Sequence, residues 1–187
     1  RVRGVRVRQA GTVRTLEADA FVSCLGSHGA RLLAAHGERL PIYPVKGYSV
    51  TAPVTDAARA PTVSLTDESR RLVASRLGDR LRVAGTAEVS GYDPTPDPSR
   101  TAPLLRWIDE LFPGACDTAR AEHWAGLRPC TPSYVPIIGR SRVLEGLWLN
   151  TGHGSLGWTL ACGSARLLAE LMLGHRNPVE AFPLHGI

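Results

Sequence analysis

The feature that most constrains the fold is a glycine-rich segment near the end of the chain, Gly152-His153-Gly154-Ser155-Leu156-Gly157. The apolar run before it, residues 147–150, predicts a buried strand. The apolar residues of 156–173 recur at helical spacing. The order strand, glycine turn and helix is the one in which a G-x-G-x-x-G pattern binds a dinucleotide.

This match does not predict the start of a Rossmann unit. Such a unit needs a second parallel strand after the helix, with an acidic residue about 20 positions on to hold the ribose. Only the tail 175–187 follows Gly174, and Glu180 has no predicted strand to lie on. We interpret the segment as a glycine turn that leads into a C-terminal helix, whose N-terminus favours a negatively charged group.

The composition indicates a globular protein with one domain, or with one domain and a piece of another. Apolar residues make up 43% of the 187 positions and charged residues 21%, which is ordinary for a soluble core-forming chain. The net charge of +5 comes from scattered arginines and one lysine, Lys46, without a basic run, so we expect no nucleic-acid partner. The chain begins at Arg1 inside a strand-like run, as a piece of a longer protein would.

The four cysteines lie far apart in the sequence. They are Cys24, Cys116, Cys130 and Cys162, with no C-x-x-C or paired-histidine spacing. We therefore expect no metal site and four free thiols in a reducing, cytoplasmic compartment. The longest apolar stretch contains Arg166 and Glu170, so it does not predict a membrane span.

The first part of the chain predicts a hairpin, a strand and a helix. Valines and arginines alternate on both sides of a glycine turn over residues 5–17. The apolar run 20–25 is typical of a fully buried strand that ends at Gly26. We expect Ser27 to cap a helix over residues 28–36.

The middle of the chain predicts an antiparallel sheet, because strand-like stretches follow one another without helices between them. These stretches cover residues 42–52, 62–66, 71–77 and 81–86. A proline-rich loop at 93–98 precedes a predicted helix over 101–111 and a strand over 119–127. The fold class that follows is α+β, an antiparallel sheet flanked by elements of another domain.

Arg128 is a candidate ligand for a carboxylate. It follows Gly126-Leu127 and precedes Pro129, which biases the Arg128 backbone towards an extended conformation and so aims the guanidinium. A planar guanidinium held in this way suits bidentate capture of a carboxylate. The alternative is a surface arginine at a corner between strand and loop.

Residues 42–49 contain the only lysine and two tyrosines around Gly47. Glycine inside a strand suggests that a ligand or another chain approaches the backbone closely. The alternative is a kinked strand with a solvent-facing Lys46. Tyr48 is the candidate substrate-binding residue of this segment.

Four segments of the chain, taken in order, form a recognisable set. They read ADAFVSCLGSHGARLL, PIYPVKGYSVTAPV, GLRPCTPSYVPIIGR and LWLNTGHGSLGWTLACGSARLLAELMLG. Together they closely resemble the FAD-dependent D-amino-acid dehydrogenases (small subunit), within the D-amino-acid oxidase and glycine oxidase superfamily. The resemblance runs over about residues 18–173 and covers the C-terminal part of the family pattern, a little under half.

The resemblance implies FAD as the cofactor and gives site residues their roles. It implies that Gly26 and Ser27 lie near the FAD pyrophosphate or ribityl chain and that Arg128 binds the substrate carboxylate. The turn under the pyrimidine end of the flavin would comprise Gly152, His153, Gly154, Ser155, Leu156 and Gly157. The resemblance singles out no side chain as a catalytic base. For His153, the alternative to a cofactor-binding role is a purely structural one.

The resemblance also implies a domain organisation. Residues 1–41 and 128–187 would belong to an FAD-binding domain, and residues 42–127 would form an antiparallel substrate or cap domain. The family's N-terminal glycine-rich Rossmann half, which holds the ADP part of FAD, is absent from this sequence. We therefore expect that half to be a required partner.

The activity implied is oxidative deamination of a small neutral D-amino acid such as D-alanine to the 2-oxo acid and ammonia. The expected electron acceptor is a quinone or another carrier, with peripheral association at the inner face of the bacterial plasma membrane. Two alternatives stay open. One is an amino-acid oxidase of the glycine or sarcosine type, and the other is a non-catalytic truncated product that needs a separate Rossmann chain.

Two departures from the family pattern fall just after Arg128. Ser133-Tyr134-Val135 stands where Asp-Gly is expected, so we expect the loop to differ in shape. Cys130 stands where methionine is commoner, and we expect no covalent bond from it to the flavin.

Overall fold

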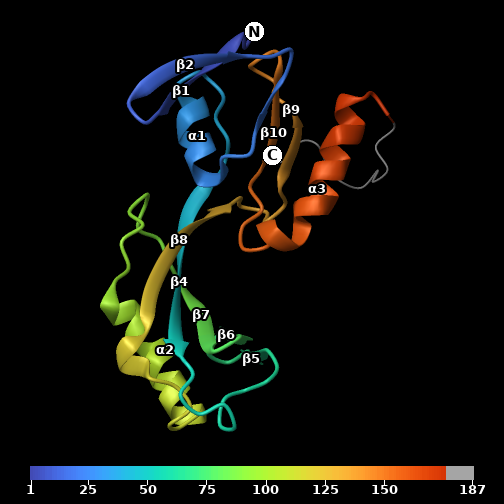
Figure 1. The fold of residues 1–187 in the computed structure, drawn as a ribbon. Coiled ribbons are helices and arrows are strands. Elements are labelled where there is room, and N and C mark those ends of the chain that lie inside the picture. The colour runs from blue at the N-terminus through green and yellow to red at the C-terminus, as the bar shows by residue number, and fades with distance from the viewer. Residues whose placement is uncertain (176–187) are drawn as a thin grey trace. The chain divides into compact units, whose positions relative to one another are not determined.

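The computed structural model describes residues 1–175, which divide into two compact units (Figure 1). The first unit contains Arg1–Tyr43 and the chain from Arg128 onward, and the second contains Pro44–Leu127. The roles predicted for residues 1–41, 42–127 and 128–187 stay predictions. Glu180 lies outside the described residues.

The first unit opens with the predicted hairpin, which is confirmed. Strands β1 (Gly4–Gln9) and β2 (Thr12–Glu17) pair antiparallel with an unbroken register. The turn between them places Ala10 at φ 46° and Gly11 at φ 82°. Two left-handed residues give the turn type whose twist matches that of the strands.

A three-stranded sheet forms the centre of the first unit. Strand β10 (Leu147–Thr151) pairs parallel with β3 (Phe21–Ser23) and antiparallel with β9 (Ile137–Arg140). β10 is buried as predicted. β3 was predicted to be fully buried and is not, because it is an edge strand of this sheet and its Val22 is 43% exposed.

One helix packs on each face of this sheet. Leu33 of α1 (Gly26–Ala34) contacts Leu147 and Leu149, while α3 (Gly157–Met172) packs Leu167 and Leu168 against Trp148 and Ile138. Because side chains alternate along β10, these contacts lie on opposite faces. The helix predicted over 156–173 is confirmed.

The prediction that Ser27 caps α1 is wrong. The helix begins at Gly26, with Leu25 at the N-cap position, so Ser27 lies inside the first turn and is buried. Gly26 has a φ of 55°, which turns the chain into the helix directly after β3.

The second unit is built on a five-stranded antiparallel sheet in the order β5-β6-β7-β4-β8. The strands are β4 (Tyr43–Pro53), β5 (Leu65–Asp67), β6 (Leu72–Leu77), β7 (Arg80–Glu88) and β8 (Glu122–Cys130). The predicted antiparallel pairing is confirmed for β4 with β7, β5 with β6 and β6 with β7. β8 follows a short 3-10 helix over Thr118–Arg120, so it begins later than predicted.

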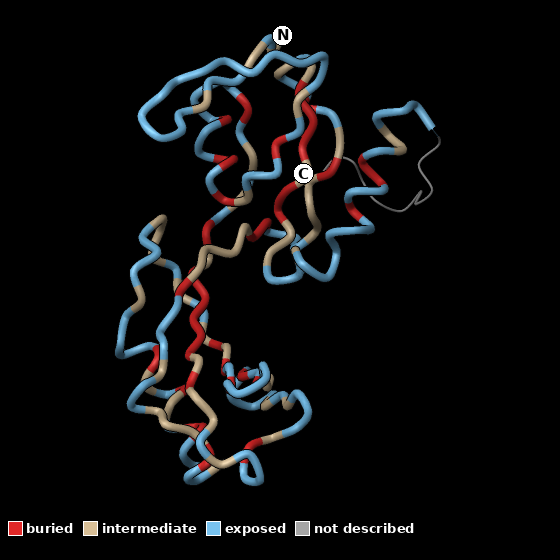
Figure 2. The backbone as a smooth tube through the Cα atoms, viewed as in Figure 1, coloured by how far each residue is buried: buried red, intermediate tan, exposed pale blue. Residues whose placement is uncertain are grey.

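Helix α2 (Pro98–Leu111) supplies the apolar cover of this sheet. Its Trp107 and Leu104 pack with Val50 and Val83, and Figure 2 shows a run of buried residues along β4. The helix begins three residues before the predicted 101, because the Asp97 carboxylate caps it by accepting a hydrogen bond from the Ser99 amide at 2.8 Å.

Candidate functional site

The glycine turn between β10 and α3 has a backbone that only glycine fits easily. Gly152 has a φ of 79° and Gly154 a φ of 56°, both in the left-handed region. A Cβ at Gly152 would also lie 2.8 Å from the Thr131 Cγ2. Space and backbone conformation therefore both require glycine at 152.

The two predicted cofactor turns meet at Pro129, inside the first unit. The Gly154 amide donates to the Pro129 carbonyl at 3.0 Å, and Cys130 forms an antiparallel bridge with His153. On the other side, the Pro129 ring lies 3.7 Å from the position of a Cβ on Gly26. The fold thus brings Gly26 and the Gly152–Gly157 turn to the residue that follows Arg128.

Both helices that start at these turns lack a side-chain cap among the described residues. Leu25 and Leu156 occupy the N-cap positions of α1 and α3, and neither first turn carries an acidic residue. The free amides of a helix N-terminus bind anions, and the helix dipole favours negative charge there. The first unit therefore has two helix starts, both next to Pro129, of the kind that suits an anion.

The chemistry of these residues fits the parts of FAD that the family resemblance implies for them. The diphosphate is an anion, and the flavin pyrimidine ring carries carbonyl oxygens that accept hydrogen bonds, so both suit uncapped amides. The His153 Nε2 is a buried atom with no hydrogen-bond partner in the described part of the chain, and burial lowers the pKa of this imidazole. The His153 imidazole is therefore available as a neutral hydrogen-bonding group.

The remaining predicted residues of the turn lie at its outer side. Ser155 is exposed, and Leu156 is 55% exposed although it is apolar. Cys130, beneath the turn, is buried, and burial raises the pKa of its thiol, so the thiol stays protonated at neutral pH. Arg128 is half-buried.

Tyr48 lies in the second unit, where its hydroxyl is already engaged. The side chain is 1% exposed and its hydroxyl donates to the Glu88 carboxylate. Lys46 pairs with the same carboxylate at 3.2 Å and donates to the Thr95 carbonyl at 3.2 Å. The alternative of a solvent-facing Lys46 is therefore wrong, since Lys46 is only 3% exposed.

The charges of this cluster support one another. Burial opposes the charge of Lys46, but hydrogen bonds with Tyr48 and Glu88 outweigh it and raise the Lys46 pKa. The Tyr48 hydrogen bond, helped by Lys46, lowers the pKa of Glu88. Burial and the Glu88 carboxylate raise the pKa of Tyr48. At neutral pH the cluster is a partly buried ion pair, with Lys46 buried and Glu88 half-buried, beside a neutral tyrosine.

Glu88 was missed in the sequence analysis, where the strand was predicted to end at 86. The pairing of β4 with β7 places Glu88 opposite Lys46, after a register shift at Gly47 and Tyr48. Such a shift cannot be read from one strand, because it depends on both partners.

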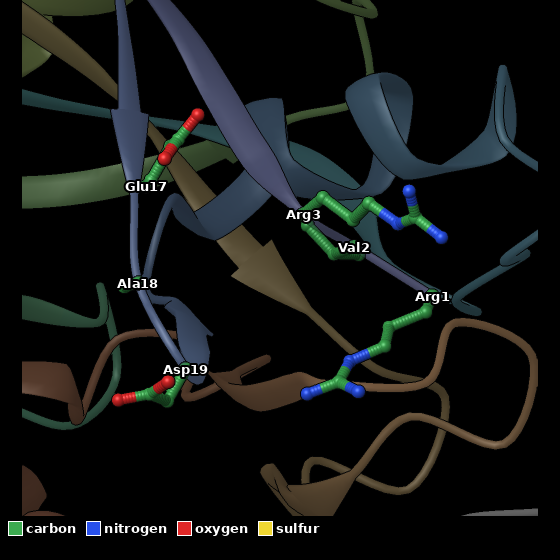
Figure 3. Close-up of a pocket in the computed structure, with 6 residues that line it drawn as sticks. All are labelled: Arg1, Val2, Arg3, Glu17, Ala18 and Asp19. Atoms are coloured by element: carbon green, nitrogen blue, oxygen red, sulfur yellow. The ribbon is translucent and has the colours of Figure 1, made fainter.

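An open hollow of about 630 Å³ lies elsewhere in the first unit (Figure 3). Arg1 and Arg3 lie across it from Glu17 and Asp19, so four of its six lining residues are charged. None of the predicted site residues lines it. We do not assign the site there.

Within residues 1–175 no group of three or more histidine, cysteine or acidic side chains is arranged to hold a metal ion. The four cysteines are free thiols. None of the helices in this part of the chain is long and apolar enough to cross a bilayer.

Comparison with known proteins gives one family model that matches residues 1–171, described as DAO, FAD dependent oxidoreductase. A D-amino acid dehydrogenase of Cereibacter sphaeroides is 50% identical over 185 residues, which cover 98% of this chain and 42% of that protein. One from Dechloromonas aromatica is 52% identical over 181 residues, which cover 96% and 43%. The chain thus spans less than half the length of these relatives.

Solved structures of two oxidases share the fold. An iminodiacetate oxidase from Chelativorans sp. BNC1 matches with a TM-score of 0.75 and 25% identity, over 95% of this chain and 51% of that one. A glycine oxidase from Geobacillus kaustophilus matches with a TM-score of 0.75 and 26% identity, over 92% and 47%.

Proposed function

The chain belongs to the DAO family of FAD-dependent oxidoreductases, and on this premise we propose that it is the C-terminal portion of a D-amino-acid dehydrogenase. The relatives that bear this name, at 50% and 52% identity, support the choice of reaction. Since the chain covers less than half of them, the activity is proposed for the whole protein. The reaction is oxidative deamination of a small neutral D-amino acid such as D-alanine.

The observation that carries the proposal is the meeting of two uncapped helix starts at Pro129, next to Arg128. We assign Gly26 and Ser27 to the pyrophosphate or ribityl chain of FAD. We assign the Gly152–Gly157 turn to the pyrimidine end of the flavin. When bound, FAD supplies a two-electron acceptor for the hydrogen on the substrate α-carbon.

Arg128 is assigned to the substrate carboxylate. Its guanidinium offers two parallel N–H donors, and Pro129 restricts the backbone that carries it. Orienting the substrate is the main task left to the protein once a cofactor accepts the electrons. We assign no side-chain base. Tyr48 stays a candidate, but with its hydroxyl bound to Glu88 its part would be to hold β4 against β7 where their register shifts.

In the first half of the proposed reaction, FAD is the only reactant needed besides the amino acid. The α-carbon would give a hydride equivalent to FAD and the amino group would release a proton to solvent, which leaves an imino acid. Water then hydrolyses the imine to the 2-oxo acid and ammonia. The two electrons pass on to a quinone or another carrier, and we propose cytoplasmic location with peripheral association at the plasma membrane.

We also propose that another part of the whole protein completes the first unit and holds the ADP half of FAD. Apolar side chains on its surface support this. Val22 is 43% exposed, Leu25 55% and Leu32 51%, while Trp158 on α3 is 96% exposed. Large apolar side chains left exposed on one unit suit a surface that another element covers.

The test uses the full-length protein with FAD and D-alanine without oxygen. We expect the flavin absorption to bleach and pyruvate and ammonia to form. Arg128→Leu should lose about a hundredfold or more in kcat/KM, since it removes two charge-assisted hydrogen bonds. Arg128→Lys should rescue poorly because lysine lacks the fork. Turnover by Arg128→Leu close to that of the parent would remove Arg128 from the site.

A second candidate is an amino-acid oxidase of the glycine or sarcosine type. The likeness to the glycine oxidase structure favours it. Steady H2O2 formation with glycine in air would support the oxidase, whereas reduction of a quinone without H2O2 would support the dehydrogenase. The remaining alternative, a non-catalytic truncated product, predicts neither.

A further inference from the structure

Tyr134 has a backbone conformation that is costly for an aromatic residue. Its φ is 59°, and only three other non-glycine residues of the described chain have a positive φ. They are Ala10 and Arg71, which lie in turns between paired strands, and Thr86, which lies in β7 where its register with β4 shifts. Tyr134 lies instead in the loop between β8 and β9. A side chain in the left-handed region clashes with its own backbone, so such a residue persists only where its surroundings impose it.

The loop is held at its base by three hydrogen bonds. The Tyr134 amide donates to the Thr131 carbonyl at 3.2 Å, and the Thr131 hydroxyl donates to the Val135 carbonyl at 2.9 Å. The Val135 amide donates to the Ser133 hydroxyl at 3.3 Å. Thr131 is 5% exposed and packs on Gly152. The strained residue therefore belongs to a fixed loop.

The Tyr134 ring is directed at the glycine turn. Its Cδ1 lies 3.6 Å from the position of a Cβ on Gly154. The residue is nevertheless 72% exposed, so most of the ring surface is uncovered. The loop thus lies along the turn, with Thr131 on Gly152 at one end and Tyr134 on Gly154 at the other.

We propose that Tyr134 is a cofactor-contacting residue whose ring packs against the planar isoalloxazine of a flavin held at the Gly152–Gly157 turn. This inference rests on the proposed function and adds a residue to its site. Two aromatic systems at a turn gain from offset or edge-to-face contact. That gain offsets the strain at Tyr134, which an exposed tyrosine with no ligand would leave uncompensated.

The experiment compares three variants of the full-length protein loaded with FAD. Tyr134→Asn removes the ring but tolerates the left-handed backbone, and Tyr134→Phe keeps a ring without the phenol. Ala10→Asn is the matched control, because it makes the same kind of change at a left-handed residue of the β1–β2 turn. The readouts are the Kd for FAD, the fluorescence of the bound flavin and the Tm of the flavin-free protein.

We expect Tyr134→Asn to raise the Kd for FAD about fivefold to tenfold while the Tm stays level or rises. The bound flavin should become more fluorescent, because a phenol quenches excited flavin by donating an electron. Tyr134→Phe should keep the Kd and still raise the fluorescence. Ala10→Asn should leave both flavin readouts unchanged.

An unchanged Kd and fluorescence in both Tyr134 variants would overturn the inference while leaving the proposed function standing. Failure of the unmodified full-length protein to bind FAD would overturn both. A lower Tm for Tyr134→Asn together with unchanged fluorescence for Tyr134→Phe would assign Tyr134 to the fold alone and would also overturn it.

Discussion

The two units of the molecule bury their apolar residues to different extents. In the second unit, Leu81, Leu104 and Ile108 are fully buried, and Trp107 is 2% exposed. In the first unit the clusters under α1 and α3 are small, and Trp158 is 96% exposed. The capping of the helices follows the same division, since Asp97 caps α2 whereas α1 and α3 have no side-chain cap in the described structure. The second unit has a closed core of its own, whereas the first leaves large apolar side chains exposed.

The largest effect expected from this difference concerns the cofactor. We predict that the 187-residue chain, purified alone, is colourless and binds FAD weakly or not at all. The pyrophosphate turn and ribose acid of a dinucleotide site come from a Rossmann half. Absorbance near the flavin band, after gel filtration with added FAD, measures this. A yellow protein with one flavin per chain would show that the first unit is complete as it stands.

Two tryptophan substitutions test the difference in side-chain burial between the units. Trp107→Ala should lower the free energy of unfolding by about 3–5 kcal/mol, because it opens a cavity in a closed core. Trp158→Ala should change it by less than about 0.5 kcal/mol, since the side chain is already in water. Urea unfolding of the chain monitors both. Similar losses in the two variants would contradict the difference in burial.

Helix caps provide a smaller test in both units. Asp97→Ala should lower the free energy of unfolding by about 1 kcal/mol, because the Ser99 amide loses its acceptor. Leu156→Asp should stabilise the chain by up to about 1 kcal/mol through a new cap on α3. In the full-length protein the same aspartate should weaken FAD binding, since it competes for the amides assigned to the flavin. Stabilisation without loss of FAD affinity would remove that assignment.

The units should also lose stability in different acid ranges. Hydrogen bonds from Ser69, the Arg70 amide and Trp107 lower the pKa of Asp67 to about 2 in the second unit. Its contribution to stability is therefore present above its ordinary pKa of 3.8 and is lost as the pH falls from there towards 2.

In the first unit, burial lowers the pKa of His153 below 6.5. The unfolded chain then binds the proton more readily, so stability falls as the pH drops below 6.5. Asp67→Asn should remove the first pH dependence and His153→Gln the second, each measured by urea unfolding at a series of pH values. Identical pH profiles for these variants and the parent would contradict the assignment.

The sequence predicted those elements whose periodicity and turn residues lie within one short segment. The hairpin at Gly11, the buried strand β10 and helix α3 each carry their periodicity and their glycine within one short segment. Strand β9 was missed, because four residues that include Gly139 give no periodic signal. It exists because β10 offers it a paired edge.

The candidate site shows the same limit. The glycines of the turn could be identified, since the backbone requires them at 152 and 154. The partnership of Lys46 with Glu88 and the contact of Tyr134 with Gly154 could not, because each joins residues brought together by the fold. The expectation that the loop at Ser133-Tyr134-Val135 has its own shape stays a prediction, and the φ of Tyr134 shows where its backbone is unusual.

The parallel pairing of β3 with β10 has a consequence for the order of folding. The two strands belong to one sheet, yet the entire second unit lies between them in the sequence. The two strands are far apart in the sequence, so pairing them costs loop-closure entropy. Only contacts that form later offset this cost. During synthesis the second unit is complete in sequence before β10 is made, so it can fold first and shorten the free chain that must be closed. The inserted unit would then act as a scaffold that brings the two parts of the first unit together.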